Sequence, residues 1–126
     1  RQQYGSLPGD MLAALGPCIG RCCYEVDGEV ARAFQCFAHA GDFLSAGTCP
    51  GKWMLDLVEA NRQQLTESGI PAGNIEASGL CTACRTDAFF SYRRSGGITG
   101  RQINFMMIKS AAACRTYFTD GPDCLH

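Results

Sequence analysis

The chain has 126 residues, a length that corresponds to one domain. Hydrophobic residues make up 46% of it and charged residues 18%, a composition that excludes an intrinsically disordered chain. The 11 Lys and Arg against 12 Asp and Glu give a net charge of −1, so we expect no nucleic-acid partner. No stretch of 18 apolar residues is present, and we expect no membrane-spanning helix.

The N-terminal part of the chain predicts a strand, a loop and a helix. Residues 5–10 have loop composition, and the apolar run at 11–15 indicates a short buried strand. The small residues at 16–24 predict a loop through which the backbone can approach a ligand closely. A helix is expected to start near Val26, with Asp27 as its N-cap.

The middle of the chain predicts an insertion followed by the clearest helix. Residues 41–51 are rich in Gly, Ser, Thr and Pro and are interpreted as an insertion. Residues 53–68 predict a helix with Leu55 on its apolar face, ended by Gly69 at the C′ position.

The last part of the chain predicts strands and a tail. Residues 74–78 alternate like a strand, 89–94 are β-prone, and 102–108 are apolar enough for a central strand. Residues 109–126 are polar and mixed, and we interpret them as a loose tail. This order of elements predicts the α+β or α/β class, with one sheet covered by helices.

Nine cysteines are present, at positions 18, 22, 23, 36, 49, 81, 84, 114 and 124. Their odd number and irregular spacing argue against a small disulfide-rich scaffold, and the first residues contain no apolar segment of the signal-peptide kind. We therefore expect reduced thiols and a cytoplasmic protein, with most of the cysteines acting as small buried apolar residues.

A zinc site within the chain is a weaker interpretation of the cysteines. Cys81 and Cys84 form a CxxC pair, but no second CxxC accompanies it, and the adjacent Cys22 and Cys23 do not have a standard ligand spacing. The helix-opening Trp-Cys context of a thioredoxin-like motif is also missing. We expect no metal ligands and no catalytic residues in this chain.

Three short segments could carry chemistry. The loop at 16–26 follows a predicted strand, where open sheets place ligands. Residues 78–82 put a thiol beside a hydroxyl, and residues 89–94 put aromatic rings beside two guanidinium groups, which suits an aromatic base and an anion. Each segment also has a purely structural interpretation. The segments 16–26 and 78–82 could be tight buried turns, and 89–94 could be a strand with arginines on the surface. His39 and His126 do not lie near residues that could form an acid–base pair or a metal triad with them, so we expect no Ser-His-Asp or Cys-His catalytic site.

Taken in order, these segments resemble the C-terminal half of the YfiH family, also called the laccase-domain, multicopper polyphenol oxidase-like or purine nucleoside phosphorylase family. The resemblance runs from about residue 5 to 108 and leaves out 38–52 and the tail. The stretches that carry it are 14–26, 55–57, 60–65, 69–71, 74–75, 78–82, 89–94 and 99–101. Each stretch alone is weak, but their common order makes the resemblance specific.

The resemblance implies an α+β layered sandwich with a mixed sheet, of which residues 1–108 form the C-terminal portion of a single domain and 109–126 a tail. It also implies one metal ion, zinc or copper, held by His, Cys and His in the N-terminal half of the domain. One segment resembles the start of a family metal motif, namely His39-Ala40-Gly41-Asp42. Because Trp-Arg-Gly does not follow it, we assign no metal ligand to this segment.

The family's activities imply a purine nucleoside phosphorylase and adenosine deaminase, with purine nucleoside, phosphate and the missing N-terminal half as partners. In that setting this chain would supply the walls of the pocket. The residues that the resemblance makes candidates for substrate binding are Cys23, Tyr24, Cys81, Thr82, Phe90, Tyr92, Arg93 and Arg94.

Alternative functions remain open at the level of sequence. They are a copper-dependent polyphenol oxidase of the laccase type, a non-catalytic binding module that lacks the metal, and a cysteine protein that responds to redox conditions. Because the chain opens on Arg1 and lacks the family's metal ligands, we expect it to be a fragment that is inactive alone.

Overall fold

The computed structural model describes residues 4–107. Its helices and strands, in chain order, are η1 (Pro8–Asp10), β1 (Ala13–Leu15), β2 (Glu25–Asp27), α1 (Gly28–Gln35), α2 (Ala40–Phe43), β3 (Leu44–Ala46), β4 (Lys52–Leu55), α3 (Leu57–Glu67), η2 (Ala72–Asn74) and β5 (Ile75–Ala77). The mixture of helices with parallel and antiparallel strands confirms the α+β class.

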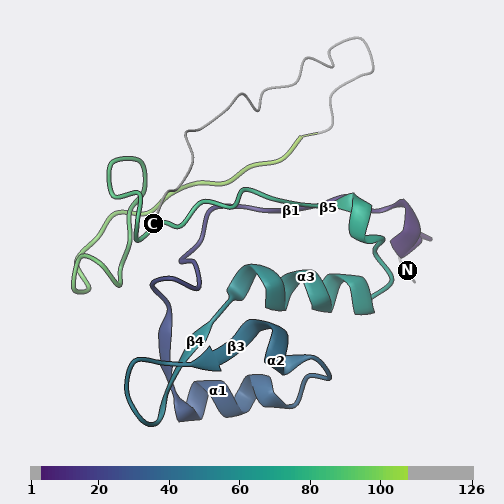
Figure 1. The fold of residues 1–126 in the computed structure, drawn as a ribbon. Coiled ribbons are helices and arrows are strands. Elements are labelled where there is room, and N and C mark those ends of the chain that lie inside the picture. Colours follow the sequence, from purple (N-terminus) through teal and green to yellow (C-terminus); the bar gives the residue numbers. More distant parts are fainter. Residues whose placement is uncertain (1–3, 108–126) are drawn as a thin grey trace.

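The strands form two separate sheets among these residues. β1 pairs with β5 in parallel, and β2, β4 and β3 form an antiparallel sheet with β4 in the centre. Figure 1 shows α3 between the two sheets, where it contacts β5 and α2, while α1 lies against β2 and β4. The predicted single mixed sheet is thus divided, with the parallel and antiparallel pairings on opposite sides of α3.

The hydrophobic core lies around the antiparallel sheet. Phe43 and Leu55 are its largest fully buried side chains, and the Phe43 ring makes edge contacts with the rings of Phe34 and Phe37. The other buried members of this cluster are Val26, Ala31, Leu44 and Ala60. All of its members come from the first half of the chain, so the segment after β5 must be held by other contacts.

The helix predicted at 53–68 is correct only in its second part. Trp53 and Leu55 belong to β4, because this segment pairs on both sides, with β2 and with β3. The helix begins after Asp56, whose carboxylate accepts a 3.0 Å hydrogen bond from the Glu59 N–H. Gly69 follows the helix with φ of 94°, as a C′ glycine should.

The predicted insertion at 41–51 is wrong. This segment contains most of α2 and all of β3, and it contributes Phe43 and Leu44 to the core. Gly47, Thr48, Pro50 and Gly51 lie in the turn between β3 and β4, whereas Gly41 belongs to α2 and Ser45 to β3. The predicted N-cap of α1 is correct in place, since Asp27 directly precedes Gly28, but the Asp27 carboxylate pairs with Lys52 and caps no helix N–H.

Two predicted strands are absent from the described part of the chain. Residues 89–91 have no regular structure, and residues 92–97 form a turn closed by local bonds such as Ser95 N–H to Ser91 O, at 3.0 Å. The described part of the last predicted strand, residues 102–107, has no regular structure and is exposed. Apolar and aromatic residues favour strands only where a neighbouring strand can pair with them. The strand predicted at 11–15 is confirmed as β1, but Met11 and Leu12 are exposed.

Residue 108 and the tail at 109–126 lie outside the described residues. Between residues 4 and 107 there is no helix with the length and hydropathy needed to cross a bilayer.

Candidate functional site

Two loops meet beyond the carboxyl ends of the parallel pair β1 and β5. Because the strands are parallel, the chain leaves both of them at the same edge. The Ser78 N–H donates to Leu15 O at 3.0 Å, and the Thr82 N–H donates to Cys18 O at 2.9 Å, beside a bridge between Cys18 and Cys81. The pairing thus brings the loop at 16–24 against the loop at 78–85, at the edge where open sheets place ligands.

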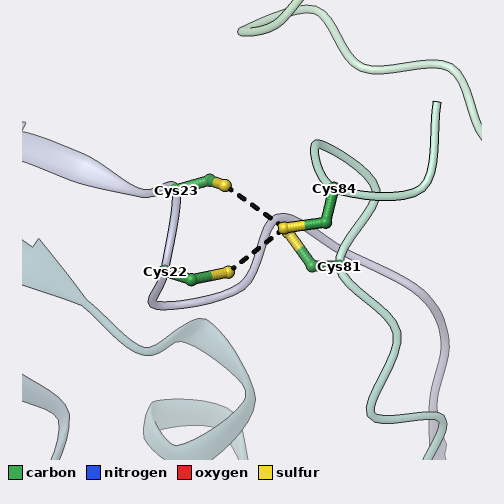
Figure 2. A group of neighbouring side chains, drawn as sticks. All are labelled: Cys22, Cys23, Cys81 and Cys84. Atoms are coloured by element: carbon green, nitrogen blue, oxygen red, sulfur yellow. Dashed lines mark hydrogen bonds between the residues drawn. The ribbon is translucent and has the colours of Figure 1, made fainter. Parts of the chain in front are cut away.

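Four cysteine side chains converge where these loops touch. Cys22 and Cys23 come from the first loop and Cys81 and Cys84 from the second, and their sulfur atoms all lie within 4.8 Å of one another. Figure 2 shows the Cys84 thiol between those of Cys22 and Cys23, at 3.5 Å from each. We call this group the four-cysteine cluster. Every cysteine in the described range is a free thiol.

The thiols of the cluster differ in acidity. Burial opposes ionisation of Cys81, but N–H groups of Gly20, Cys84 and Ala83 donate to its sulfur and lower its pKa to about 6. Burial, followed by the hydrogen bonds to Cys84, Cys81 and Cys23, raises the pKa of Cys22. Without a bound cation, negative charge in the cluster therefore gathers on Cys81 at neutral pH.

An aromatic pocket of about 320 Å³ lies beside the cluster. Its lining contains two rings of the segment 89–94, Phe90 and Tyr92, together with Tyr24 of the first loop. Thr82, Ser91, Arg93 and Ile19 complete the wall. Thr82 and Ser91 are buried, whereas Phe90 is 57% and Tyr92 67% exposed, so the two rings form an open rim over a polar floor.

Arg93 is held at the wall of this aromatic pocket. Its guanidinium lies 5.4 Å from the centre of the Tyr24 ring, a cation–π distance, and its Nη1 donates to Glu25 O at 2.9 Å. Since a guanidinium has five N–H donors, this bond leaves donors for a further acceptor. Tyr24 in turn packs against the hydrophobic core.

The eight residues predicted for substrate binding fall into three groups. Five of them line the aromatic pocket together: Tyr24, Thr82, Phe90, Tyr92 and Arg93. Cys23 and Cys81 lie in the four-cysteine cluster, each directly before a residue of the pocket wall. Arg94 is exposed and outside the lining, with its backbone N–H directed at Ser91 Oγ, 3.4 Å away.

The four-cysteine cluster is not predicted from the sequence. A zinc site usually combines one CxxC pair with a second, whereas here the partner of Cys81 and Cys84 is the adjacent pair Cys22 and Cys23, far away in the chain. The signal that could have revealed the cluster is the position of both pairs, each a few residues after a strand. Parallel pairing of those strands would have placed the cysteines together.

The described residues do not supply a His-Cys-His metal site. The only histidine among them, His39, borders a depression along α3 with Glu59, Arg62 and Gln63. This depression shares no lining residue with the aromatic pocket. The four-cysteine cluster is a group that could bind a metal, but its ligands are all sulfur.

Known proteins resemble this chain over most of its length. It is 38% identical over 110 residues to the purine nucleoside phosphorylase YlmD of Bacillus subtilis, covering 87% of this chain and 40% of that protein. It is 41% identical over 98 residues to the adenosine deaminase RL5 of an unknown prokaryotic organism, covering 77% of this chain and 37% of the relative. The chain therefore spans about two fifths of the curated relatives that it matches.

A solved structure agrees with the fold. The hypothetical protein YfiH of Bacillus licheniformis superposes with a TM-score of 0.72 at 41% identity, over 76% of this chain and 36% of that one. The family model described as multi-copper polyphenol oxidoreductase laccase matches residues 1–109. With sequence, fold and motif order in agreement, the chain belongs to this laccase-like family, to which the resemblance to YfiH pointed.

Proposed function

We propose that this chain is the C-terminal part of a metal-dependent enzyme that cleaves purine nucleosides with phosphate and also deaminates adenosine. The observation that carries the proposal is the aromatic pocket, which combines three rings with a guanidinium and buried hydroxyl groups. The names of the relatives, purine nucleoside phosphorylase and adenosine deaminase, support the same reaction classes. The missing N-terminal half of the domain would complete the site.

The rings suit the purine. A purine is a flat aromatic base, and stacking of a base on an aromatic side chain contributes about 1–3 kcal/mol. Phe90 and Tyr92 are exposed and line the aromatic pocket, so a base that enters it can contact their rings. The hydroxyl groups of Thr82 and Ser91 lie in the floor and can bond polar atoms of the nucleoside.

Arg93 suits the phosphate. In phosphorolysis a phosphate oxygen forms a bond to C1′ of the ribose while the bond from C1′ to the purine nitrogen breaks. The electron pair leaves with the purine, which then takes up a proton. A guanidinium at the wall would attract the phosphate dianion and orient it by charge-assisted hydrogen bonds. Arg93 meets this requirement better than Arg94, because only Arg93 lines the aromatic pocket.

The family implies a metal ion, and we infer that it is zinc or copper held by residues outside this chain. When bound, such an ion would activate water for deamination. The residues described here do not fit that ion, because His39 has no neighbouring thiolate or second histidine at its depression. The part of this chain in the reaction is accordingly to bind and orient the nucleoside and the phosphate.

We also propose the extent and the location of the protein. Residues 1–108 would form the C-terminal portion of one domain and 109–126 a tail, which the family match to residues 1–109 supports. The free thiols of the described cysteines support a cytoplasmic protein.

The test uses the complete protein that contains this chain. Arg93→Gln is expected to weaken phosphate binding by about 10–100-fold, since a hydrogen bond to a charged group is worth about 1.5–3 kcal/mol. Arg94→Gln decides between the two arginines, and Arg32→Gln, exposed on α1, is the control. Phosphorolysis rates are measured against phosphate concentration at saturating adenosine.

An unchanged KM for phosphate in Arg93→Gln would contradict the assigned role of Arg93. Oxidation of a phenol by the complete protein, without turnover of adenosine, would instead favour the copper-dependent polyphenol oxidase. Binding of adenosine without any turnover would favour the non-catalytic module.

A further inference from the structure

We propose that the four-cysteine cluster is a structural zinc site, formed by Cys22, Cys23, Cys81 and Cys84 of this chain alone. It would be separate from the metal that the family implies, because its ligands are four thiolates. The proposal does not depend on the nucleoside chemistry proposed above.

The geometry of the sulfur atoms fits a tetrahedral ion. A zinc–sulfur bond of about 2.3 Å places the four sulfur atoms of a tetrahedron about 3.8 Å apart. Here the four sulfur atoms lie within 4.8 Å of one another, and two of the separations are 3.5 Å. Shifts below about 1 Å would therefore bring all four to bonding distance of one ion.

A disulfide explains the cluster less well. A disulfide joins two sulfur atoms at about 2.05 Å, well below the 3.5 Å that separates Cys84 from Cys22 and from Cys23. Cys84 lies equally far from Cys22 and Cys23, so the arrangement does not select one pair. Figure 2 shows the side chains of both loops directed toward a common point, as ligands of one ion are.

The backbone around the cluster prepares it for a metal. The Gly20 N–H donates to the Cys81 sulfur at 3.2 Å, the kind of outer bond that orients a metal ligand. A side chain at Gly20 would fit only tightly against this group, since its Cβ would lie 3.2 Å from Cys81 Cβ and 3.5 Å from the Cys22 sulfur. The Cys23 N–H donates to Gly20 O, closing the turn that directs both adjacent thiols toward the second loop.

Zinc is the ion that this donor set favours. Thiolate ligands select zinc over the harder ions, and a closed set of four leaves no open position for substrate, so the site would be structural. Cys22 and Cys84 are exposed, which gives the ion a route of entry.

The zinc ion would add to the contacts that hold the segment after β5 against the first loop, such as the bond from Thr82 N–H to Cys18 O. After β5 the described chain has no helix or strand, and no residue of that segment belongs to the core cluster around the antiparallel sheet. An ion bound by both loops would fix Tyr24, next to Cys23, and Thr82, next to Cys81, at a constant separation. It would thereby hold two opposite parts of the aromatic pocket wall in place.

The experiment uses the full chain, purified without oxygen in a reducing buffer. Zinc is counted by mass spectrometry of the metal, and one ion per chain is expected. The double variant Cys22→Ser/Cys84→Ser should lose zinc affinity by more than the roughly 10–100-fold that loss of an outer-shell partner costs. The control is Cys36→Ser/Cys49→Ser, which removes two exposed cysteines outside the cluster and should keep its zinc.

Two further measurements on the unmutated chain do not depend on the folding of a variant. Titration with Co²⁺ should give a thiolate-to-cobalt charge-transfer band and the visible spectrum of tetrahedral coordination. With zinc present, alkylation should label the exposed Cys36 and Cys49 and spare the four cysteines of the cluster. Absence of the cobalt band, labelling of the cluster cysteines as fast as Cys36 and Cys49, a disulfide within the cluster, or stoichiometric iron in place of zinc would overturn the proposal.

Discussion

Replacement of Phe43 tests whether α2 and β3 belong to the core rather than to an insertion. The side chain is 1% exposed, and its ring centre lies 6.1 Å from that of Phe34 and 6.4 Å from that of Phe37. Phe43→Ala should lower the free energy of unfolding by about 3–5 kcal/mol, as expected for a buried phenylalanine. Phe43→Leu keeps much of the apolar volume and should lose about 1–3 kcal/mol, the contribution of two edge-to-face ring pairs.

Urea denaturation of the 126-residue chain, followed by circular dichroism, measures both losses. The matched control is Phe105→Ala, because Phe105 is 85% exposed, and its effect should stay within about 0.5 kcal/mol. If Phe43→Ala leaves too little folded protein to measure, Phe43→Leu still gives a value. A loss for Phe43→Leu no larger than that for Phe105→Ala would refute the placement of Phe43 in the core.

Two more predictions follow from local contacts. Gly47→Ala should destabilise the protein by about 1–3 kcal/mol, because the new Cβ would lie 2.6 Å from the Lys52 carbonyl carbon. Gly73→Ala is the control: its Cβ would meet nothing within 4 Å, so the free energy of unfolding in the same urea assay should change by less than about 0.5 kcal/mol. The Thr48 hydroxyl, and after it the Thr48 backbone N–H, donate to the Glu25 carboxylate and lower its pKa. The ionised carboxylate therefore stabilises the fold at pH values above the ordinary pKa of a glutamate, and this stabilisation is lost as the pH falls through the lowered pKa. Thr48→Val should raise that pKa toward its ordinary value, as a carboxyl NMR titration would show. Thr66→Val, whose hydroxyl donates to Arg62 O, should leave it unchanged.

The candidate site was predictable where it consists of short segments of distinctive composition. The aromatic and arginine residues at 89–94 and the small-residue loop at 16–24 were identified from sequence, and five of the eight predicted binding residues line one pocket. Their assembly was not predictable, because it depends on which strands pair. The segment 89–94 reaches the aromatic pocket without forming a strand, although its residues favour one.

The assembly of the four-cysteine cluster was not predictable for the same reason: it depends on which strands pair. Local spacing describes ligands that are neighbours in the chain, such as the pair Cys81 and Cys84. It carries no information on the second pair, which arrives through the parallel pairing of β1 with β5.

The α+β class, the end of α3 before Gly69, the strand predicted at 74–78 and the family membership could be predicted from composition, local backbone preference and the order of motifs. The placement of Leu55 in a strand and of Phe43 in the core, and the meeting of two pairs of cysteines, could not be predicted in this way. Strand pairing and burial depend on contacts between distant segments, and such contacts override the weak preferences of each segment taken alone.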